Sequence, residues 1–245
     1  IHAFSTMRTD GASQGAYAQF NINPYCGDAP EHVAQNLHSL CRVLGIAPSN
    51  LVMPHQTHET TVRQVGSELL SMPQNVRQMV LEGVDALITN VPGVCIGVST
   101  ADCIPILLYD AEHRATAAIH AGWRGTVKRI AQNAIAQMRA AFNTNPRTLS
   151  AVIAPGISLQ HFEVGDEVYE AFAKAAFPMN DIAQRHNKWH INLPLCNQLQ
   201  LQELGVKAEN IYATDICTYN RCNDFFSARR LGINSGRIFT GVTIR

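Results

Sequence analysis

The 245-residue sequence predicts an α+β fold in which mixed β-sheet layers are flanked by helices. Short apolar runs typical of buried strands gather in the middle of the chain, and amphipathic helical segments lie among them in irregular order. Apolar residues make up 46% of the chain and charged residues 16%, so a sizeable core can be buried. The length suits one large domain, and we expect residues 1–245 to form it.

The expected elements follow from the spacing of apolar residues and from residues that start or stop helices. Residues 28–45 predict a helix, because apolar side chains recur on one face, Pro30 stands near the start and Gly45 at the end. Residues 68–83 are polar and less patterned, which indicates a peripheral excursion or a short helix. We further expect strands at 94–98, 104–109, 115–119, 148–154 and 238–244, and helices at 126–142, 166–177 and 192–204.

Charge and cysteine content narrow the class of protein. Lysine plus arginine and aspartate plus glutamate both number 19, and a nucleic-acid binder would usually show a basic excess. The seven cysteines form no C-x-x-C pair and suggest no disulfide framework, which fits reduced thiols in a cytoplasmic protein. No segment approaches the roughly 20 apolar residues of a membrane span. We therefore expect a small-molecule partner, with neither nucleic acid nor membrane.

Three polar segments fall at the ends of expected strands or in turns, where sites usually lie. They are residues 54–58, 99–103 and 120–126. Cys103 comes just before the strand at 104–109, and His120 follows the strand at 115–119. If these two strands form an antiparallel hairpin, Cys103 and His120 become neighbours at one edge of the sheet.

A thiolate and imidazoles at that edge predict a zinc-type site, since zinc prefers nitrogen and sulfur ligands. Three protein ligands would leave one tetrahedral position open, as in catalytic sites. Zinc lowers the pKa of a bound water to about 7, which would supply a nucleophile for a carbon such as C6 of adenine. Spacing alone does not separate His58 from His55 as the third ligand.

Several other site classes lack their motifs. Neither a Walker P-loop nor a G-x-G-x-x-G segment occurs. His161-Phe162-Glu163 has the H-x-E form of zinc nucleobase deaminases, but the P-C-x-x-C partner is missing. No H-x-H occurs, so a conventional multicopper oxidase does not fit.

Ordered motifs along nearly the whole chain resemble the YfiH-like family, also called laccase-domain proteins, polyphenol oxidases or peptidoglycan-editing factors. The most specific segment is H-A-G-W-R-G at 120–125. The other matching segments are F-S-T-x-R at 4–8, Q-x-H at 56–58, D-A-L-I-T at 85–89, A-D-C-I-P at 101–105, I-A-P-G-I at 153–157, F-E-V-G at 162–165, C-T-Y at 217–219 and F-F-S-x-R-R at 225–230.

The resemblance implies that residues 1–245 are a single YfiH-like catalytic domain with zinc, or copper, bound by His58, Cys103 and His120. It further implies phosphorolysis of adenosine, inosine, guanosine and methylthioadenosine, together with deamination of adenosine. The family's other names imply two alternatives: copper-dependent polyphenol oxidation, and a Cys-His hydrolase acting on peptidoglycan precursors. In the hydrolase, Cys103 would be the nucleophile and His120 its base.

Further roles can be assigned to polar and aromatic residues near these motifs. Asp102 or His55 could relay protons, and Asp85 could orient a ligand histidine. Phosphate would need cationic donors, for which guanidinium groups are suited. The candidate arginines are Arg8, Arg124 and Arg229, and the candidates for stacking on a base are Trp123, Tyr219 and Phe226.

Overall fold

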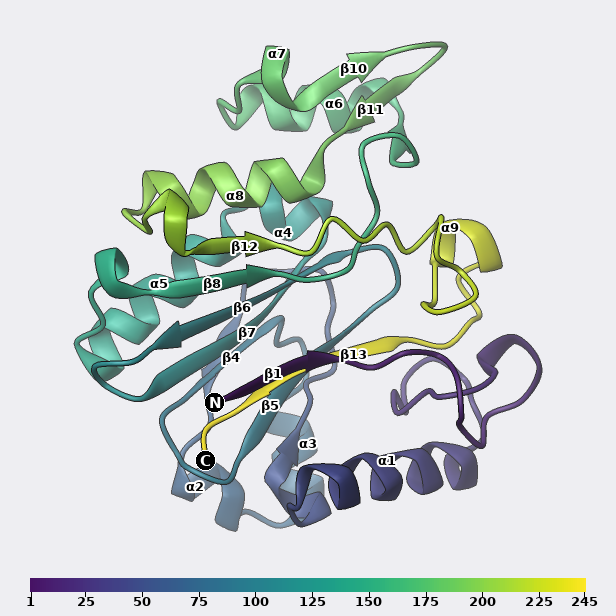
Figure 1. Ribbon diagram of the computed structural model, residues 1–245, viewed down its shortest axis with the longest axis vertical. Helices are drawn as coiled ribbons and strands as arrows, with labels where there is room; N and C mark the ends of the chain where they lie inside the picture. The colour runs from purple at the N-terminus through teal and green to yellow at the C-terminus, as the bar shows by residue number, and fades with distance from the viewer.

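The computed structural model describes residues 1–245 and shows two β-sheets packed against each other, with helices on both outer sides (Figure 1). The predicted α+β class, with mixed sheets flanked by helices, is confirmed. None of the helices combines the length and the hydropathy that a membrane-spanning segment requires.

The larger sheet has six strands and contains the hairpin that follows Cys103 and carries His120. Its central strands β6 and β7 are antiparallel, and Pro105 lies opposite His120 in their register. The antiparallel hairpin on which the proximity of Cys103 and His120 depends is therefore present. In spatial order the strands are β12 (Ile211–Ala213), β8 (Ser150–Ile153), β6 (Ile104–Asp110), β7 (Ala115–Ala121), β4 (Ala86–Thr89) and β3 (Val62–Gln64).

The second sheet has four strands and lies against the other face of the first. Side chains alternate along β7, so that Ile119 packs in the core cluster on the helical side and Ala118 in the cluster shared with the second sheet. That shared cluster also contains Val98 and Val242. In spatial order the strands are β1 (His2–Ser5), β13 (Ile238–Thr243), β5 (Cys95–Thr100) and β2 (Leu51–Val52).

Helices cover both outer faces of the paired sheets, and a small third sheet lies at one end (Figure 1). On the six-stranded sheet lie α4 (Trp123–Val127), α5 (Ile130–Phe142) and α8 (Leu193–Glu203). Against the four-stranded sheet lies α1 (Pro30–Leu44), with α2 (Ser67–Ser71) and α3 (Gln74–Val80) nearby. The small sheet pairs β10 (Ala183–Arg185), β11 (Trp189–Ile191) and β9 (Glu163–Val164), beside α6 (Asp166–Lys174) and α7 (Met179–Ile182); α9 (Ala228–Leu231) follows later in the chain.

One expected helix is interrupted. The sequence predicted a continuous helix at 126–142, but α4 ends at Val127 and α5 begins at Ile130. Arg129 between them has a left-handed backbone with φ of 64°. Its guanidinium donates to the Ala175 carbonyl at 2.8 Å and lies over the Phe177 ring. These tertiary contacts stabilise the break between the two helices at Arg129. No glycine or proline in the sequence indicates this break.

Candidate metal centre

The structure brings His58, Cys103 and His120 together where the chain passes between the two sheets. His58 lies in the connection between β2 and β3, Cys103 in the loop that joins β5 to β6, and His120 on β7. Their ligand atoms all lie within 4.8 Å of one another. The three side chains form a His-Cys-His metal site, since two imidazoles and a thiol present their ligand atoms at one place.

Asp85, just before β4, organises two of the three ligands. Its carboxylate is fully buried and accepts a hydrogen bond from His120 Nδ1 at 2.7 Å, which directs the other ring nitrogen towards Cys103. The same carboxylate accepts bonds from the backbone N–H groups of Thr57, His58 and Glu59 at 2.9–3.2 Å. His58 itself has a left-handed backbone with φ of 65°. A single carboxylate thus holds the His58 turn and the His120 ring.

The cysteine and the buried histidine shift each other's pKa. Burial alone would raise the pKa of the Cys103 thiol, but the charge of His120 and hydrogen bonds from His120 and His58 lower it to about 6. Burial would likewise lower the pKa of His120, but the Cys103 thiolate and the Asp85 hydrogen bond raise it to about 9. Without metal, each group therefore favours the charged form of the other.

This ionisation predicts how Cys103 reacts with an alkylating reagent. In chelator-treated protein, we expect iodoacetamide to modify Cys103 at neutral pH, with half-maximal rate near pH 6. The thiolate is present above its lowered pKa of about 6 and is lost as the pH falls through that value. Burial raises the pKa of Cys95 to about 12, so that thiol should stay unreactive. Peptide mass spectrometry across pH would measure both, and zinc should protect Cys103.

A half-maximal rate near pH 9 would show that His120 does not activate the thiol.

Gly122 leaves the space that the metal centre needs. A Cβ on this residue would lie 3.0 Å from both Cys103 Sγ and His58 Cδ2, and 3.8 Å from His120 Cε1. The glycine thus borders all three ligands, and the hollow between their nitrogen and sulfur donors suits a borderline-soft ion. The space beside Gly122 and the nitrogen and sulfur donors around it therefore both suit a metal ion.

Gly122→Ala is expected to weaken zinc binding about 10-fold or more, because the methyl group pushes ligand side chains out of position. Competition with a chromophoric chelator would measure the affinity. Gly93→Ala is a comparison elsewhere in the chain, where a Cβ meets no atom within 4 Å, although a positive φ of 76° strains it. That variant should keep the wild-type affinity even where it loses some stability. Equal zinc affinity in both variants would argue against the steric role.

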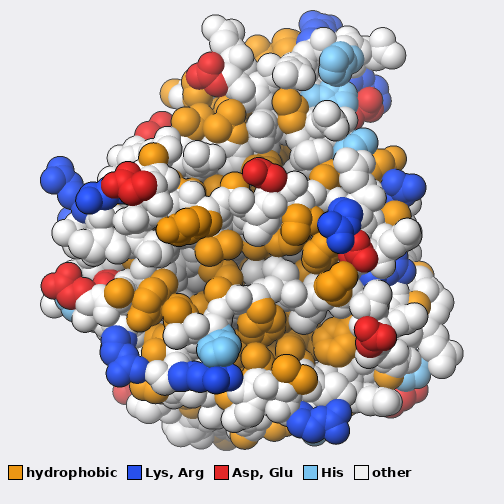
Figure 2. Space-filling model, in the orientation of Figure 1, with side chains coloured by type: hydrophobic (Ala, Val, Ile, Leu, Met, Phe, Trp, Pro, Cys, Tyr) orange, Lys and Arg blue, Asp and Glu red, His pale blue; other side chains and the backbone are white.

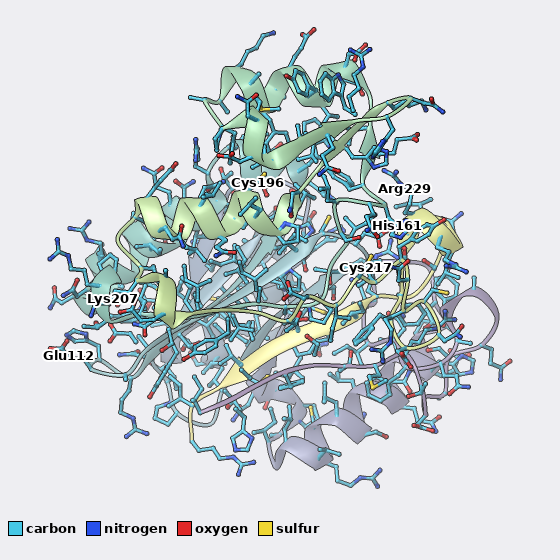
Figure 3. The ribbon with its side chains drawn as sticks, turned by 45° about the horizontal axis from the view of Figure 1, so that its top comes forward. Glu112, His161, Cys196, Lys207, Cys217 and Arg229 are labelled. Carbon is cyan, nitrogen blue, oxygen red and sulfur yellow. The ribbon has the colours of Figure 1, made fainter.

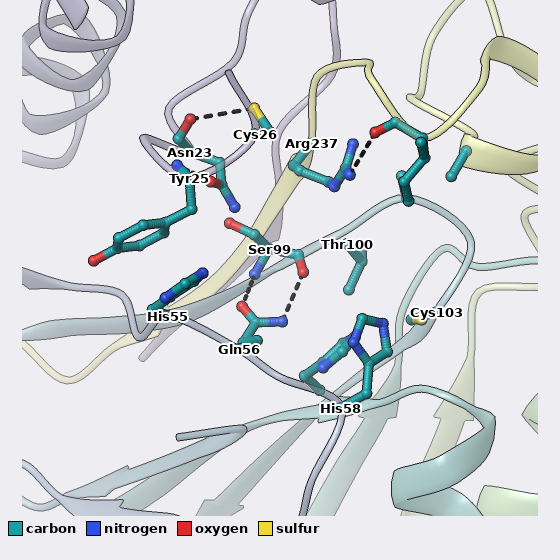
Figure 4. A pocket seen from close by; sticks show the side chains of 14 residues that line it. Asn23, Tyr25, Cys26, His55, Gln56, His58, Ser99, Thr100, Cys103 and Arg237 are labelled. Carbon is teal, nitrogen blue, oxygen red and sulfur yellow. Dashed lines mark hydrogen bonds between the residues drawn. The ribbon is translucent and has the colours of Figure 1, made fainter. Parts of the chain in front are cut away.

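The metal centre opens into a pocket on the side of the first loops of the chain (Figure 4). His55 lines it, stacked on Tyr25 at 4.1 Å between ring centroids, with its Nδ1 bonded to Glu82 at 2.8 Å. Gln56 fixes the connecting turn, since its side-chain amide exchanges two hydrogen bonds with the backbone of Ser99 at 2.7 and 2.8 Å. The two histidines that spacing could not separate therefore occupy different places: His58 at the ligand cluster and His55 on the pocket wall.

Asp102 and Arg229 belong to one network behind the metal centre. Asp102 accepts hydrogen bonds from the Thr218 hydroxyl and from the Arg229 backbone N–H, both at 2.7 Å. The Arg229 side chain donates to the carbonyls of Glu163 and His161. Figure 3 shows Arg229 beside His161. Neither side chain lines the pocket. These contacts hold the Cys103 loop against the C-terminal segment, while the proton-relay and phosphate roles stay predictions.

Arg8 and Phe226 face each other away from the pocket. The Arg8 guanidinium donates to the carbonyls of Ala18 and Cys222 and lies 4.8 Å from the centre of the Phe226 ring. Phe226 is 0% exposed. In this conformation the arginine joins three segments of chain, and the ring has no face open to a base.

Arg124 and the remaining aromatic candidates also lie outside the pocket lining. Arg124 is exposed on α4 and lies over the Trp123 ring at 4.3 Å, and Tyr219 is stacked on His161. Sequence reasoning missed the pocket residues Arg237 and Asn23, which no motif singled out, whereas Thr100 lies in the segment 99–103 that the sequence indicated.

The fold and this centre define a metal-binding α+β protein whose three-ligand site opens into a pocket. A family model described as multi-copper polyphenol oxidoreductase laccase matches residues 2–245, and the chain belongs to that family. The resemblance to YfiH-like, laccase-domain proteins is thereby confirmed.

Individual relatives align over almost the whole chain. A purine nucleoside phosphorylase of Bacteroides thetaiotaomicron is 48% identical, with 100% of this chain and 92% of that protein covered. An adenosine deaminase from an unknown prokaryotic organism is 43% identical, with coverages of 99% and 93%. The crystal structure of YlmD from Geobacillus stearothermophilus gives a TM-score of 0.91 at 28% identity, with coverages of 99% and 91%.

Proposed function

We propose that this protein is a zinc-dependent enzyme that phosphorolyses adenosine, inosine, guanosine and methylthioadenosine, and deaminates adenosine. The observation that carries the proposal is the three-ligand His-Cys-His centre, which opens into a pocket rather than closing on a fourth side chain. The names of relatives that match at least 99% of the chain support both reactions. We also place the protein in the cytoplasm, in keeping with its seven free cysteines.

His58, Cys103 and His120 would hold the zinc ion. When bound, zinc supplies Lewis acidity and lowers the pKa of water in the open coordination position. The protein's own contribution is to fix the ligands, through Asp85 and the Gly122 turn, and to shape the adjoining pocket.

Both proposed reactions need a proton donor for the leaving group. In deamination, a water oxygen bonds to C6 of adenosine, the C6–N bond breaks and the nitrogen leaves as ammonia after gaining a proton. In phosphorolysis, a phosphate oxygen bonds to C1′, the C1′–N9 bond breaks, and the base takes the electron pair and a proton. His55 suits this role as a relay: Glu82 holds its Nδ1, and its Nε2 could take a proton from the attacking water or phosphate and pass it to the leaving nitrogen.

The test is to identify adenosine products, with and without phosphate, on protein of measured metal content. Adenine and ribose 1-phosphate that form only with phosphate, beside about one zinc per chain, would establish the phosphorylase. Inosine formed without phosphate would establish the deaminase. If zinc-loaded protein yields neither, the purine assignment fails.

A second candidate is a Cys-His hydrolase acting on peptidoglycan precursors. The ordered contacts from Cys103 to His120 to Asp85 favour it, because they match a nucleophile, a base and an orienting carboxylate. A metal-bound thiolate is a poor nucleophile, so activity that rises when zinc is removed would support this reading.

The family description keeps copper-dependent phenol oxidation as another candidate. Two imidazoles and a thiolate also suit copper. Oxygen uptake with phenols by copper-loaded protein would support oxidation, and its absence would exclude it.

A further inference from the structure

The pocket beside the metal centre contains a single strong cation. Among the side chains that line it, Arg237 is the one lysine or arginine, and none is an aspartate or glutamate. A pocket with this charge, next to a site for a divalent ion, favours an anionic ligand. On the face of the molecule shown in Figure 2, by contrast, acidic and basic side chains are interspersed.

Strand pairing places Arg237 close to the loop of Cys103. Ile238, the first residue of β13, lies opposite Thr100, the last residue of β5. Arg237 precedes Ile238 and is therefore beside the point where the chain leaves β5 for the metal ligand. Figure 4 shows Arg237 and Asn23 on one wall of the pocket and His58 on the other, with Thr100 between them.

The Arg237 guanidinium is held in place but retains free donors. It donates to the carbonyls of Ile233, Ser235 and Gly236, which lie in the short loop before β13. Its Nε has no partner within the protein. The three bonds fix the planar group in one orientation, so little side-chain freedom is lost when an anion binds.

Two neighbouring groups could complete an anion site. The Thr100 hydroxyl is buried and has no hydrogen-bond partner in the protein, which is unfavourable unless a water or ligand oxygen accepts from it. The Asn23 side-chain oxygen accepts from the Tyr25 N–H, and its amide nitrogen makes no bond within the protein. Both residues line the same pocket as Arg237.

We propose that Arg237 binds the phosphate co-substrate beside the metal centre. This assignment rests on the proposed phosphorolysis, in which a phosphate oxygen forms the new bond to C1′ as the C1′–N9 bond breaks. It differs from the assignment to Arg8, Arg124 and Arg229, whose side chains do not line the pocket.

The test compares Arg237→Gln with wild type in both reactions. In zinc-loaded protein, we expect the KM for phosphate to rise about 10-fold or more, because the charge-assisted hydrogen bonds to the anion are lost. Adenosine deamination in phosphate-free buffer should fall much less than phosphorolysis, because that reaction uses no phosphate. Arg237→Lys should restore part of the phosphate affinity. Calorimetric titration of inorganic phosphate, without nucleoside, provides a second readout.

Arg230→Gln is the matched control, since Arg230 lies on the neighbouring α9, bonds the Tyr219 carbonyl and does not line the pocket. Wild-type phosphate binding in Arg237→Gln would overturn the proposal. An equal loss of both reactions would do the same, because it would show that the arginine only supports its loop. If Arg124→Gln or Arg229→Gln lowers the affinity for phosphate and Arg237→Gln does not, phosphate binding would be assigned to Arg124 or Arg229. Wild-type protein that turns over no nucleoside would contradict the proposed function, while the phosphate titration would still test Arg237.

Discussion

Cys103→Ala is expected to abolish both zinc binding and nucleoside turnover. Cys103 supplies the one thiolate of the three ligands, and His120 keeps its ring directed at the thiolate through Asp85. Loss of a group that merely orients a ligand weakens metal binding about 10–100-fold, so loss of a ligand should exceed that. Metal analysis after dialysis and quantitation of adenosine products would measure the two effects.

The control for this variant is Cys196→Ala. Cys196 lies on α8 with 0% exposure, in the core cluster of the helical side, so its replacement should lower stability without changing zinc content. Full nucleoside turnover in Cys103→Ala would refute the metalloenzyme proposal. Intact zinc binding with lost turnover would instead favour Cys103 as a nucleophile.

Asp85→Asn is the second variant with a large expected effect. The carboxylate accepts four hydrogen bonds, one from His120 and three from the turn that contains His58. An amide would direct N–H groups at some of these donors, so the ring and the turn lose their common anchor. We expect zinc affinity to fall about 10–100-fold. The free energy of unfolding should fall by about 3 kcal/mol, in the range for breaking a buried charged pair.

Asp110→Asn is a close control. Asp110 is also 0% exposed, and it accepts from a histidine Nδ1, that of His113, at 2.9 Å and from two backbone N–H groups. Asp110 is the last residue of β6 and therefore lies at the opposite end of that strand from Cys103, which comes just before its first residue. Its replacement should destabilise the fold but leave zinc affinity unchanged. If both variants keep wild-type zinc affinity, Asp85 does not act through the metal ligands.

The sequence predicted the parts of the fold in which apolar patterning is long and local. The runs around β5, β6 and β7 were expected, whereas their antiparallel pairing, which joins Cys103 to His120, was only a condition of the sequence argument. Strands of two or three residues, such as β2 and β9, are too short to show a period of two. The break at Arg129 depends on contacts with Ala175 and Phe177, which are distant in sequence.

The site residues also include some that motifs predict and others that depend on long-range strand pairing. The ligand set follows from motifs, and Asp85 was expected as an orienting group because it stands in one of them. The choice among arginines could not be made from motifs, since it depends on the pairing of β13 with β5, about 140 residues apart in sequence. That pairing brings Arg237, and not the three arginines near the motifs, to the pocket.

The positions of the three ligands have a consequence for folding thermodynamics. His58 and His120 are 62 residues apart, and Cys103 lies on the crossover between the two sheets. In the unfolded chain these donors are scattered, so the ion binds the native state in preference, and its binding free energy adds to stability by mass action. Free zinc at about 1,000 times its dissociation constant would add about 4.1 kcal/mol. The folded fraction of this protein should therefore depend on metal supply, with the ion acting as a reversible cross-link between β7 and the two connections that join the sheets.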